Sequence, residues 1–285
     1  MKILLTGCDG QLGYELQRSL PSKHELLAID QQQLDITDST AVDSYINTHH
    51  PDIIINAAAY TAVDKAESEE KVAWTVNSTG ANNLATTAKA INARMIQIST
   101  DFVFSGKHHQ PYTPDDLAEP ISVYGASKYA GDQAVLSILG LQACVLRTSW
   151  LYSAHGNNFV KTMLALMQER DELTIIADQI GTPTWAATLA DTVWLAIDAE
   201  LQGTYHCADN GIASWYDFAV AIQEDALALG LLSKTAAIKP IRTSDYPTAA
   251  ARPSYSVMDK TKTEADLTIS LPYWRHTLRK MLKEL

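Results

Sequence analysis

Short apolar runs alternate with amphipathic stretches through the first half of the chain, and this alternation limits the fold more than any other feature. It is typical of successive βα units, which build a parallel sheet covered by helices on both faces. We expect strands at residues 3–5, 25–29, 52–56, 95–99 and 143–147. The intervening helices are expected at residues 11–20, 39–48, 70–91 and 122–139. The sequence therefore predicts an α/β fold with a doubly wound parallel sheet.

The character of the chain changes after Trp150, where loops lengthen and proline, tryptophan and tyrosine become frequent. We predict a Rossmann-type domain over residues 1–150 and a smaller, partly interleaved substrate-binding part over residues 151–285. Residues 173–207 are expected to return to the first domain. Within them, 173–177 and 204–207 have the pattern of further strands, and 187–199 has that of a helix.

Composition narrows the classes of partner. The formal net charge of −11 argues against a nucleic-acid surface, because phosphate backbones require clustered Lys and Arg. The three cysteines have no CxxC spacing and the histidines no ligand spacing, so neither disulfides nor a zinc site is indicated. The first apolar run is too short for a signal peptide, and no later run reaches transmembrane length. We expect a cytoplasmic protein without a membrane or nucleic-acid partner.

Three glycines, Gly7, Gly10 and Gly13, stand between the first strand and the first helix with GxxGxxG spacing. Gly7 permits a tight turn, Gly10 lets backbone N–H groups approach a pyrophosphate, and Gly13 allows close helix–sheet packing. A glycine trio can also be an ordinary turn. Asp30, which ends the second strand about 20 residues after Gly10, favours dinucleotide binding, since such an acid accepts hydrogen bonds from the adenosine ribose.

Residues after later strands complete the predicted cofactor site. Asp35 and Ile36 would hold the adenine, although Asp35 could equally be a helix-start residue. The small side chains of residues 57–59 would let the backbone pass under a cofactor, or simply pack tightly. Because no arginine neighbours Asp30, NADH should be accepted, and NADPH is not excluded. The predicted cofactor-binding residues are Gly7, Gly10, Gln11, Leu12, Gly13, Asp30, Asp35, Ile36, Ala57, Ala58, Ala59, Tyr60, Thr61, Tyr124 and Lys128.

Tyr124 and Lys128 form a YxxxK element on a predicted helix. Residues four apart share one helix face, so the phenol and the ammonium can meet, although an exposed Tyr/Lys pair is the ordinary alternative. A nearby cation would lower the phenol pKa, and Tyr124 could then protonate a carbonyl oxygen that receives hydride while Lys128 binds the nicotinamide ribose. Thr100 ends the preceding strand, at the sheet edge where ligands bind, and would supply a third hydrogen bond.

Together these elements resemble the extended short-chain dehydrogenase/reductase superfamily. Further segments narrow the resemblance to the dTDP-4-dehydrorhamnose reductase family, and they extend over nearly the whole chain. These segments are NAAAYTAVDKAE (56–67), STDFVF (99–104), VYG (123–125), RTSWLY (147–152), GNNF (156–159), DQIGTPT (178–184) and ARP (251–253).

The resemblance implies that the 4-keto group of dTDP-4-dehydrorhamnose is reduced with NADPH or NADH. The product would be dTDP-L-rhamnose, a precursor of bacterial surface polysaccharide. Tyr124 would be the proton donor. For Trp150, core packing is an alternative to contact with the sugar ring. The implied substrate-binding residues are Thr100, Asp101, Trp150, Val63, Asn157, Asn158, Phe159 and Arg252.

Two departures from the family pattern matter. Phe102 stands where many members carry tyrosine, so one hydroxyl near the substrate is missing. Some members dimerise through magnesium held by glutamates; Glu15 and Glu284 resemble two of them, but residues 185–188 offer no third carboxylate. Magnesium is therefore not expected as a dimer bridge. We expect a monomer or a weak homodimer with no metal site.

Two other functions share these features. An NDP-sugar epimerase or dehydratase uses the same cofactor and YxxxK machinery, but a dehydratase needs an Asp-Glu pair where this chain has Asp101-Phe102. A non-catalytic NAD(P)-binding module, as in the regulatory subunit of methionine adenosyltransferase, would keep the fold alone. The intact Thr100, Tyr124 and Lys128 favour an enzyme.

Overall fold

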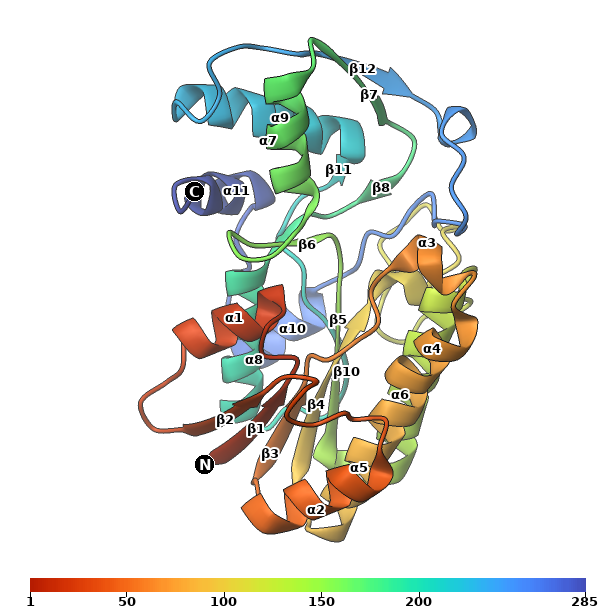
Figure 1. The fold of residues 1–285 in the computed structure, drawn as a ribbon, viewed down its shortest axis with the longest axis vertical. Helices are drawn as coiled ribbons and strands as arrows, with labels where there is room; N and C mark the ends of the chain where they lie inside the picture. Colours follow the sequence, from red (N-terminus) through yellow and green to blue (C-terminus); the bar gives the residue numbers. More distant parts are fainter.

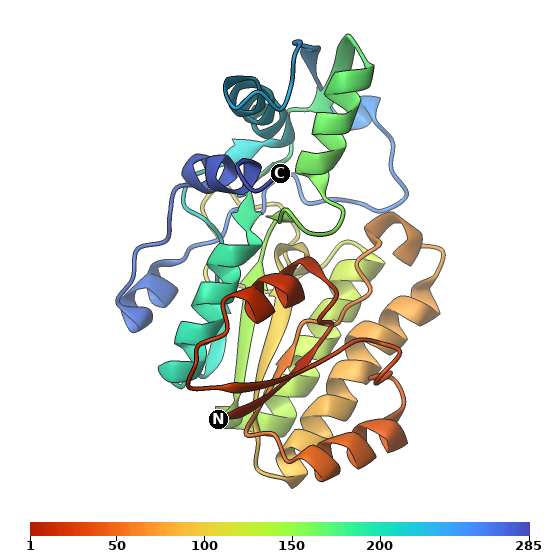
Figure 2. The ribbon, with the colours of Figure 1, turned by 60° about the vertical axis from the view of Figure 1, so that its left-hand side comes forward.

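The computed structural model describes all residues 1–285 and is built on one six-stranded parallel sheet (Figures 1 and 2). Its spatial order is β2-β1-β3-β4-β5-β10, so the winding direction reverses between β1 and β3 and opens a crevice at their carboxyl ends. The expected α/β class is confirmed, and each of the five expected strands is present. The strands are β1 (Lys2–Thr6), β2 (Glu25–Ile29), β3 (Ile53–Asn56), β4 (Arg94–Thr100), β5 (Ala143–Thr148) and β10 (Gly203–His206).

Helices cover both faces of this sheet (Figure 2). Alternation along β1 sends Ile3 and Leu5 to the core under α1 (Gln11–Arg18) and α8 (Ala186–Asp198). Leu4 points to the opposite core, under α2 (Ser39–His49), α5 (Ala81–Ala90) and α6 (Val123–Leu139). Since both faces are buried, the strands are apolar throughout rather than alternating with polar residues.

The helix expected at 70–91 is composite. After the short α3 (Val63–Ala66), α4 (Glu70–Trp74) leads into a π-helical segment (Thr75–Gly80) and then into α5. A π-helical turn makes one side chain bulge from the regular ladder, and such turns are frequent at functional sites. Here it carries the buried Asn77 to the loop after β3.

Residues 173–177 do not join the central sheet, contrary to our expectation. They lie in β7 (Glu172–Ile176), which pairs in parallel with β12 (Ala237–Ile241) in the C-terminal lobe. Leu173 and Ile175 of β7 are buried in that lobe's own core, which satisfies their apolar faces there. The chain returns to the central sheet only with α8 and β10, where β10 pairs with β5.

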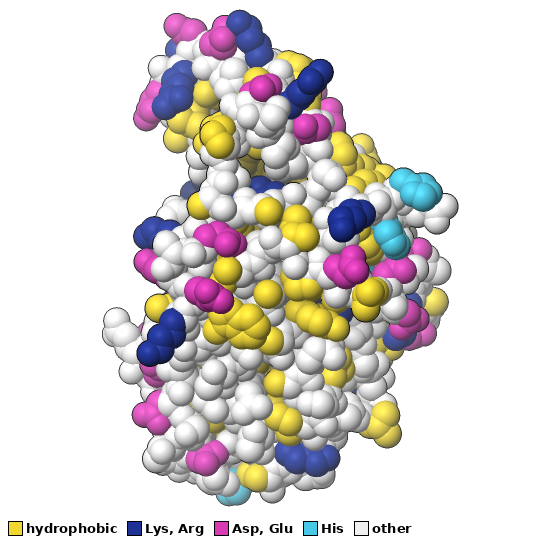
Figure 3. Space-filling view, turned by 90° about the vertical axis from the view of Figure 1, so that its right-hand side faces the viewer, with side chains coloured by type: hydrophobic (Ala, Val, Ile, Leu, Met, Phe, Trp, Pro, Cys, Tyr) yellow, Lys and Arg dark blue, Asp and Glu magenta, His cyan; other side chains and the backbone are white.

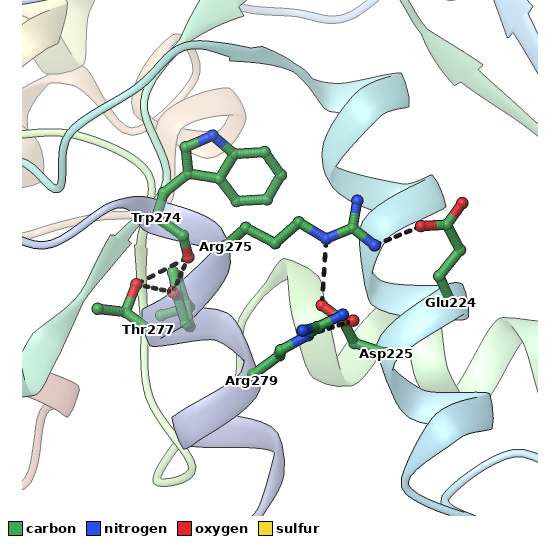
Figure 4. Close-up of polar contacts among 7 residues, drawn as sticks. Glu224, Asp225, Trp274, Arg275, Thr277 and Arg279 are labelled. Carbon is green, nitrogen blue, oxygen red and sulfur yellow. Dashed lines mark hydrogen bonds and ion pairs between the residues drawn. The ribbon is translucent and has the colours of Figure 1, made fainter.

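The C-terminal lobe packs α7 (Phe159–Glu169), α9 (Trp215–Ala228) and α11 (Trp274–Leu282) into one aromatic-rich core. Figure 4 shows Arg275 and Arg279 of α11 reaching Glu224 and Asp225 of α9. Shorter elements complete the lobe and its junction: β6 (Leu151–Tyr152) with β9 (Thr184–Trp185), and β8 (Ile180–Gly181) with β11 (Ala213–Ser214). The short α10 (Thr261–Leu267) instead lies beside β10, where Leu267 packs on the core of the larger body.

In Figure 1 the C-terminal lobe lies above the larger body that contains the central sheet. Figure 3 shows the side of the molecule on which α3 to α6 cover that sheet. Lys and Arg side chains on this face are scattered among Asp and Glu rather than gathered into one patch. None of the helices combines the length and apolar character needed to cross a bilayer.

Candidate active site

The glycine-rich loop forms a cradle at the carboxyl end of β1. Gly7 has φ +73°, and a Cβ there would lie 2.7 Å from the backbone nitrogen of Ala58. A Cβ on Gly13 would lie 2.3 Å from the Gly7 carbonyl oxygen, whereas one on Gly10 would meet only that oxygen, at 3.4 Å. No side chain caps the N-terminus of α1, so its first amides remain available to an anion. The cradle therefore fits the pyrophosphate of a dinucleotide.

The rim of the cradle contains Asp30 at the end of β2. One of its carboxylate oxygens accepts from the backbone N–H of Gln33 at 2.9 Å, which leaves the other outside this turn. Asp35 is exposed and accepts from the N–H and hydroxyl of Thr37, so its contacts are those of a local turn. Ile36 is 5% exposed and packs under Gly80, so its side chain belongs to the core.

The loop after β3 is held by Asn77, which is not among the site residues predicted from the sequence. The Asn77 amide accepts from the N–H of Tyr60 at 2.8 Å and donates to the Tyr60 carbonyl at 3.1 Å. It also donates to the Ser127 hydroxyl of α6 at 3.0 Å. These bonds hold residues 57–61 beside the cradle. Its position on a helix gave no sequence signal, because the π-helical turn that aims it is a tertiary feature.

Tyr124 and Lys128 lie on one face of α6, as predicted, beside the carboxyl end of β4. The Ser122 hydroxyl begins this helix by accepting from the N–H of Gly125 at 3.2 Å. Lys128 is 3% exposed, and its ammonium donates to the Ile98 carbonyl at 2.6 Å. Thr100 is the last residue of β4 and is 5% exposed. The structure therefore brings Thr100, Tyr124 and Lys128 together.

The acid–base character of Tyr124 differs from our expectation. Burial raises the pKa of its phenol to about 12, against a hydrogen bond with Thr100 that lowers it. Lys128 is not among the groups that shift this pKa, and its ammonium donates to the Ile98 carbonyl. Burial also lowers the pKa of Lys128 itself. Tyr124 is therefore a protonated phenol at neutral pH, which is the form that a proton donor requires.

Asp101 and Phe102 lie beside Thr100 and Tyr124. Asp101 is 2% exposed, and burial raises its carboxyl pKa to about 6 against hydrogen bonds from Ser256 and Thr100. The ring of Phe102 packs edge-on against Tyr124, with ring centroids 5.5 Å apart. Phe102 therefore supplies an apolar wall to the Tyr124 ring.

The loop at residues 157–159 reaches the cradle from the C-terminal part. The amide of Asn158 donates to the Gln11 side chain at 2.9 Å, and its oxygen caps α7 by accepting from the N–H of Lys161 at 3.1 Å. Phe159 packs on Trp215, with centroids 4.7 Å apart, while Asn157 is exposed. Asn158 thus connects the cofactor cradle to the C-terminal part, and Phe159 belongs to its aromatic packing.

Trp150 is half-buried and has φ +45°, a backbone conformation rare for so large a residue. Its ring stacks on Trp215, with centroids 3.6 Å apart and an interplanar angle of 7°. The ring also lies against Gly181, where a Cβ would come within 2.6 Å. These contacts support the packing alternative for Trp150; its contact with a sugar stays a prediction.

Arg252 crosses from the C-terminal segment to α3. Its guanidinium binds both carboxylate oxygens of Asp64, at 3.0 and 2.7 Å, and Asp64 follows the half-buried Val63 directly. The same bonds lower the Asp64 carboxyl pKa. Arg252 and Val63, two of the implied substrate-binding residues, thus lie near each other where the C-terminal part meets the N-terminal domain.

Glu15 and Glu284, the two glutamates compared with magnesium ligands, both pair with Arg18. The Arg18 guanidinium lies 2.8 Å from Glu15 and 2.9 Å from Glu284, and the Ser153 hydroxyl donates to Glu15 at 2.7 Å. The positive charge beside these two carboxylates is therefore the guanidinium of Arg18. No group of three or more His, Cys, Asp or Glu side chains is arranged to hold a metal ion.

Comparisons with known proteins agree with this geometry. The family model described as the RmlD substrate binding domain matches residues 1–285. A dTDP-4-dehydrorhamnose reductase of Aggregatibacter actinomycetemcomitans is 41% identical, over 98% of this chain and 97% of its own length. The crystal structure of such a reductase from Bacillus anthracis, in complex with NADP, has a TM-score of 0.95 and 38% identity, covering 100% of this chain and 99% of its own.

More distant structures share the fold alone. A UDP-glucose 4-epimerase from Thermus thermophilus, in complex with NAD, has a TM-score of 0.82 at 19% identity and covers 99% of this chain and 98% of its own. The Rossmann-type architecture expected from the sequence is therefore confirmed. Its occurrence in enzymes of different activity means that the side chains at the site, rather than the fold, must decide the reaction.

Proposed function

This chain belongs to the RmlD substrate-binding-domain family, together with dTDP-4-dehydrorhamnose reductases, and we propose that it reduces the 4-keto group of dTDP-4-dehydrorhamnose to give dTDP-L-rhamnose. NADPH or NADH would supply the hydride. The observation that carries the proposal is the placement of Thr100, Tyr124 and Lys128 at one sheet edge beside the Gly7–Gly13 cradle.

Each of these residues has a role that follows from its environment. Tyr124 holds its proton at neutral pH and donates it to the carbonyl oxygen as negative charge develops there. Thr100 lies beside the Tyr124 hydroxyl, whose pKa it lowers, and would hydrogen-bond to the same substrate oxygen. Lys128 places a buried positive charge one helical turn away, where it binds the nicotinamide ribose.

The substrate half of the site is proposed at the junction of the two parts. Asp101 provides a buried carboxyl group beside Thr100, and Arg252 presents a cation at the rim, near Val63. Asn157 is exposed in the loop whose next residue contacts the cradle, so it can meet a ligand there. Trp150 would contact the sugar with the part of its ring that Trp215 leaves exposed.

The test is the absorbance of NADPH mixed with the purified protein and dTDP-4-keto-6-deoxy-L-mannose. A reductase consumes one coenzyme per sugar, and we expect the absorbance to fall in proportion to the sugar added. An epimerase converts the sugar without net loss of the coenzyme, and a binding module does neither. Either of those results would refute the proposal.

Asp30 is expected to set the choice of coenzyme. Replacing it with alanine should weaken NADH binding and spare or improve NADPH binding, because a ribose acceptor and a charge that repels the 2′-phosphate disappear together. Asp30→Asn is the matched control, since it retains an oxygen for the Gln33 N–H and loses only the charge. Equal losses for both coenzymes in Asp30→Ala, measured by fluorescence titration, would contradict this assignment.

We further propose a cytoplasmic monomer or weak homodimer whose association does not depend on magnesium. Arg18 already pairs with both Glu15 and Glu284, so a divalent cation would have to compete with a guanidinium for these carboxylates. Sedimentation velocity should give the same mass with magnesium and with EDTA. A mass that halves when the metal is chelated would show that a metal bridge exists after all.

A further inference from the structure

Asp132 lies on the same face of α6 as Tyr124 and Lys128, one helical turn beyond the lysine. Its side chain is 0% exposed. One carboxylate oxygen accepts a hydrogen bond from the Ser99 hydroxyl of β4, and the other has no hydrogen-bond partner. A fully buried carboxylate with a free oxygen is costly unless charges nearby compensate for the lost water.

The charges around Asp132 come from two elements. Lys128 on α6 is 3% exposed, and Arg147 on β5 is 4% exposed. Tyr124 and Asp101 are the titratable groups on the side of the site, Tyr129 and His206 lie near Arg147, and the π-helical segment presents the neutral Asn77. Beyond Tyr124 along α6, the buried set therefore contains two cations, Lys128 and Arg147, and one carboxylate, Asp132.

The electrostatic effects in this set are reciprocal. Burial lowers the pKa of Lys128, and the negative charge of Asp132 opposes that change. Burial raises the pKa of Asp132 to about 6, against Lys128, Ser99 and Arg147, which lower it. At pH 7 and above Asp132 is therefore mostly ionised and attracts the ammonium that stands between it and the site.

We propose that Asp132 is a positioning residue for coenzyme binding, which keeps Lys128 in its ammonium form while the Ile98 carbonyl holds that ammonium in place. Asp132 touches neither coenzyme nor sugar and acts only through Lys128. The inference rests on the proposed role of Lys128 at the nicotinamide ribose. It adds that the strength of this contact depends on a negative charge one turn further along α6.

The experiment compares NADPH dissociation constants between pH 6 and pH 10 for the wild type and Asp132→Asn. Asparagine keeps the shape and an acceptor for Ser99 but removes the charge, and a neighbouring opposite charge shifts a pKa by about 1–3. We expect the rise of Kd at alkaline pH to begin at least about one pH unit lower in the variant. The two Kd values should converge toward pH 6, because a falling pH favours the ammonium form of Lys128 in both proteins.

Asp209→Asn is the matched control, because Asp209 is also 0% exposed, is bonded to Thr277 and lies in the C-terminal part. Its alkaline rise of Kd should coincide with that of the wild type. Ser99→Ala is the second variant: it removes the hydroxyl but keeps the carboxylate, which is ionised at alkaline pH in any case, so the rise should again stay at the wild-type pH.

A uniform loss of affinity at every pH in Asp132→Asn would overturn the proposal and assign Asp132 to helix packing. An alkaline rise at the wild-type pH would also overturn it. If Asp132→Asn does not fold, Ser99→Ala decides, since a shift of a full pH unit there would mean that the hydroxyl, and not the charge, controls Lys128. These measurements use coenzyme alone, so they are independent of whether the sugar assay succeeds.

Discussion

Tyr124→Phe should lose nearly all turnover and still bind NADPH. The variant removes only the hydroxyl that carries the transferred proton, and general acid catalysis contributes roughly 10²–10⁴ in rate. The phenyl ring would keep its edge-on contact with Phe102, so the site should stay folded. The measurement is kcat with the keto sugar beside Kd for NADPH, with circular dichroism to check folding.

Tyr129→Phe provides the control for that variant. Tyr129 lies on the same helix and is half-buried, but it packs against the small cluster around Phe104 and Tyr112 rather than at the site. It should keep wild-type kcat. If Tyr124→Phe retained more than about a tenth of wild-type kcat, a smaller loss than general acid catalysis supplies, Tyr124 would not be the proton donor.

Alanine at Gly13 and alanine at Gly10 should both weaken coenzyme binding, but only alanine at Gly13 should lower stability. At Gly13 the added Cβ would lie 2.3 Å from the Gly7 oxygen and 2.6 Å from backbone atoms of Cys8, so α1 must move. Overpacking of this kind costs about 1–3 kcal/mol, and we expect a lower Tm together with weakened coenzyme binding. At Gly10 the Cβ meets only the Gly7 oxygen at 3.4 Å, so stability should be preserved.

Gly10→Ala should nevertheless weaken NADPH binding by about tenfold or more, equal to about 1.4 kcal/mol, because its Cβ would occupy the open side of the cradle that the pyrophosphate approaches. Thermal unfolding followed by circular dichroism and a coenzyme titration separate the two effects. Unchanged NADPH affinity in Gly10→Ala, with normal Tm, would remove this loop from the coenzyme site.

The local elements of this fold could be predicted from the sequence because their signals are local. Apolar runs marked the central strands, and the YxxxK spacing placed Tyr124 and Lys128 on one helix face, where the structure has them. The glycine spacing predicted the cradle, whose contacts at Gly7 and Gly13 tolerate no Cβ. Periodicity and spacing depend only on neighbours along the chain, and they remain valid wherever the element finally packs.

Contacts between segments that are far apart in the sequence could not be predicted in this way. Residues 173–177 have the pattern of a strand, but only the presence of β12 in the C-terminal lobe decides which edge they join. Arg18 stands between Glu15 and Glu284, near opposite ends of the chain, because the last residues of the chain return to α1. Trp150 meets Trp215 for the same kind of reason.

The electrostatics of the site also required the tertiary structure. YxxxK alone suggested that Lys128 lowers the pKa of Tyr124, whereas the folded chain raises it and turns the ammonium toward the Ile98 carbonyl. Burial and the direction of a hydrogen bond are set by β4 and β5, which the spacing within one helix does not contain. The sequence thus determined which groups take part, and packing between distant elements decided their charge states, because the loss of water depends on everything that surrounds a group.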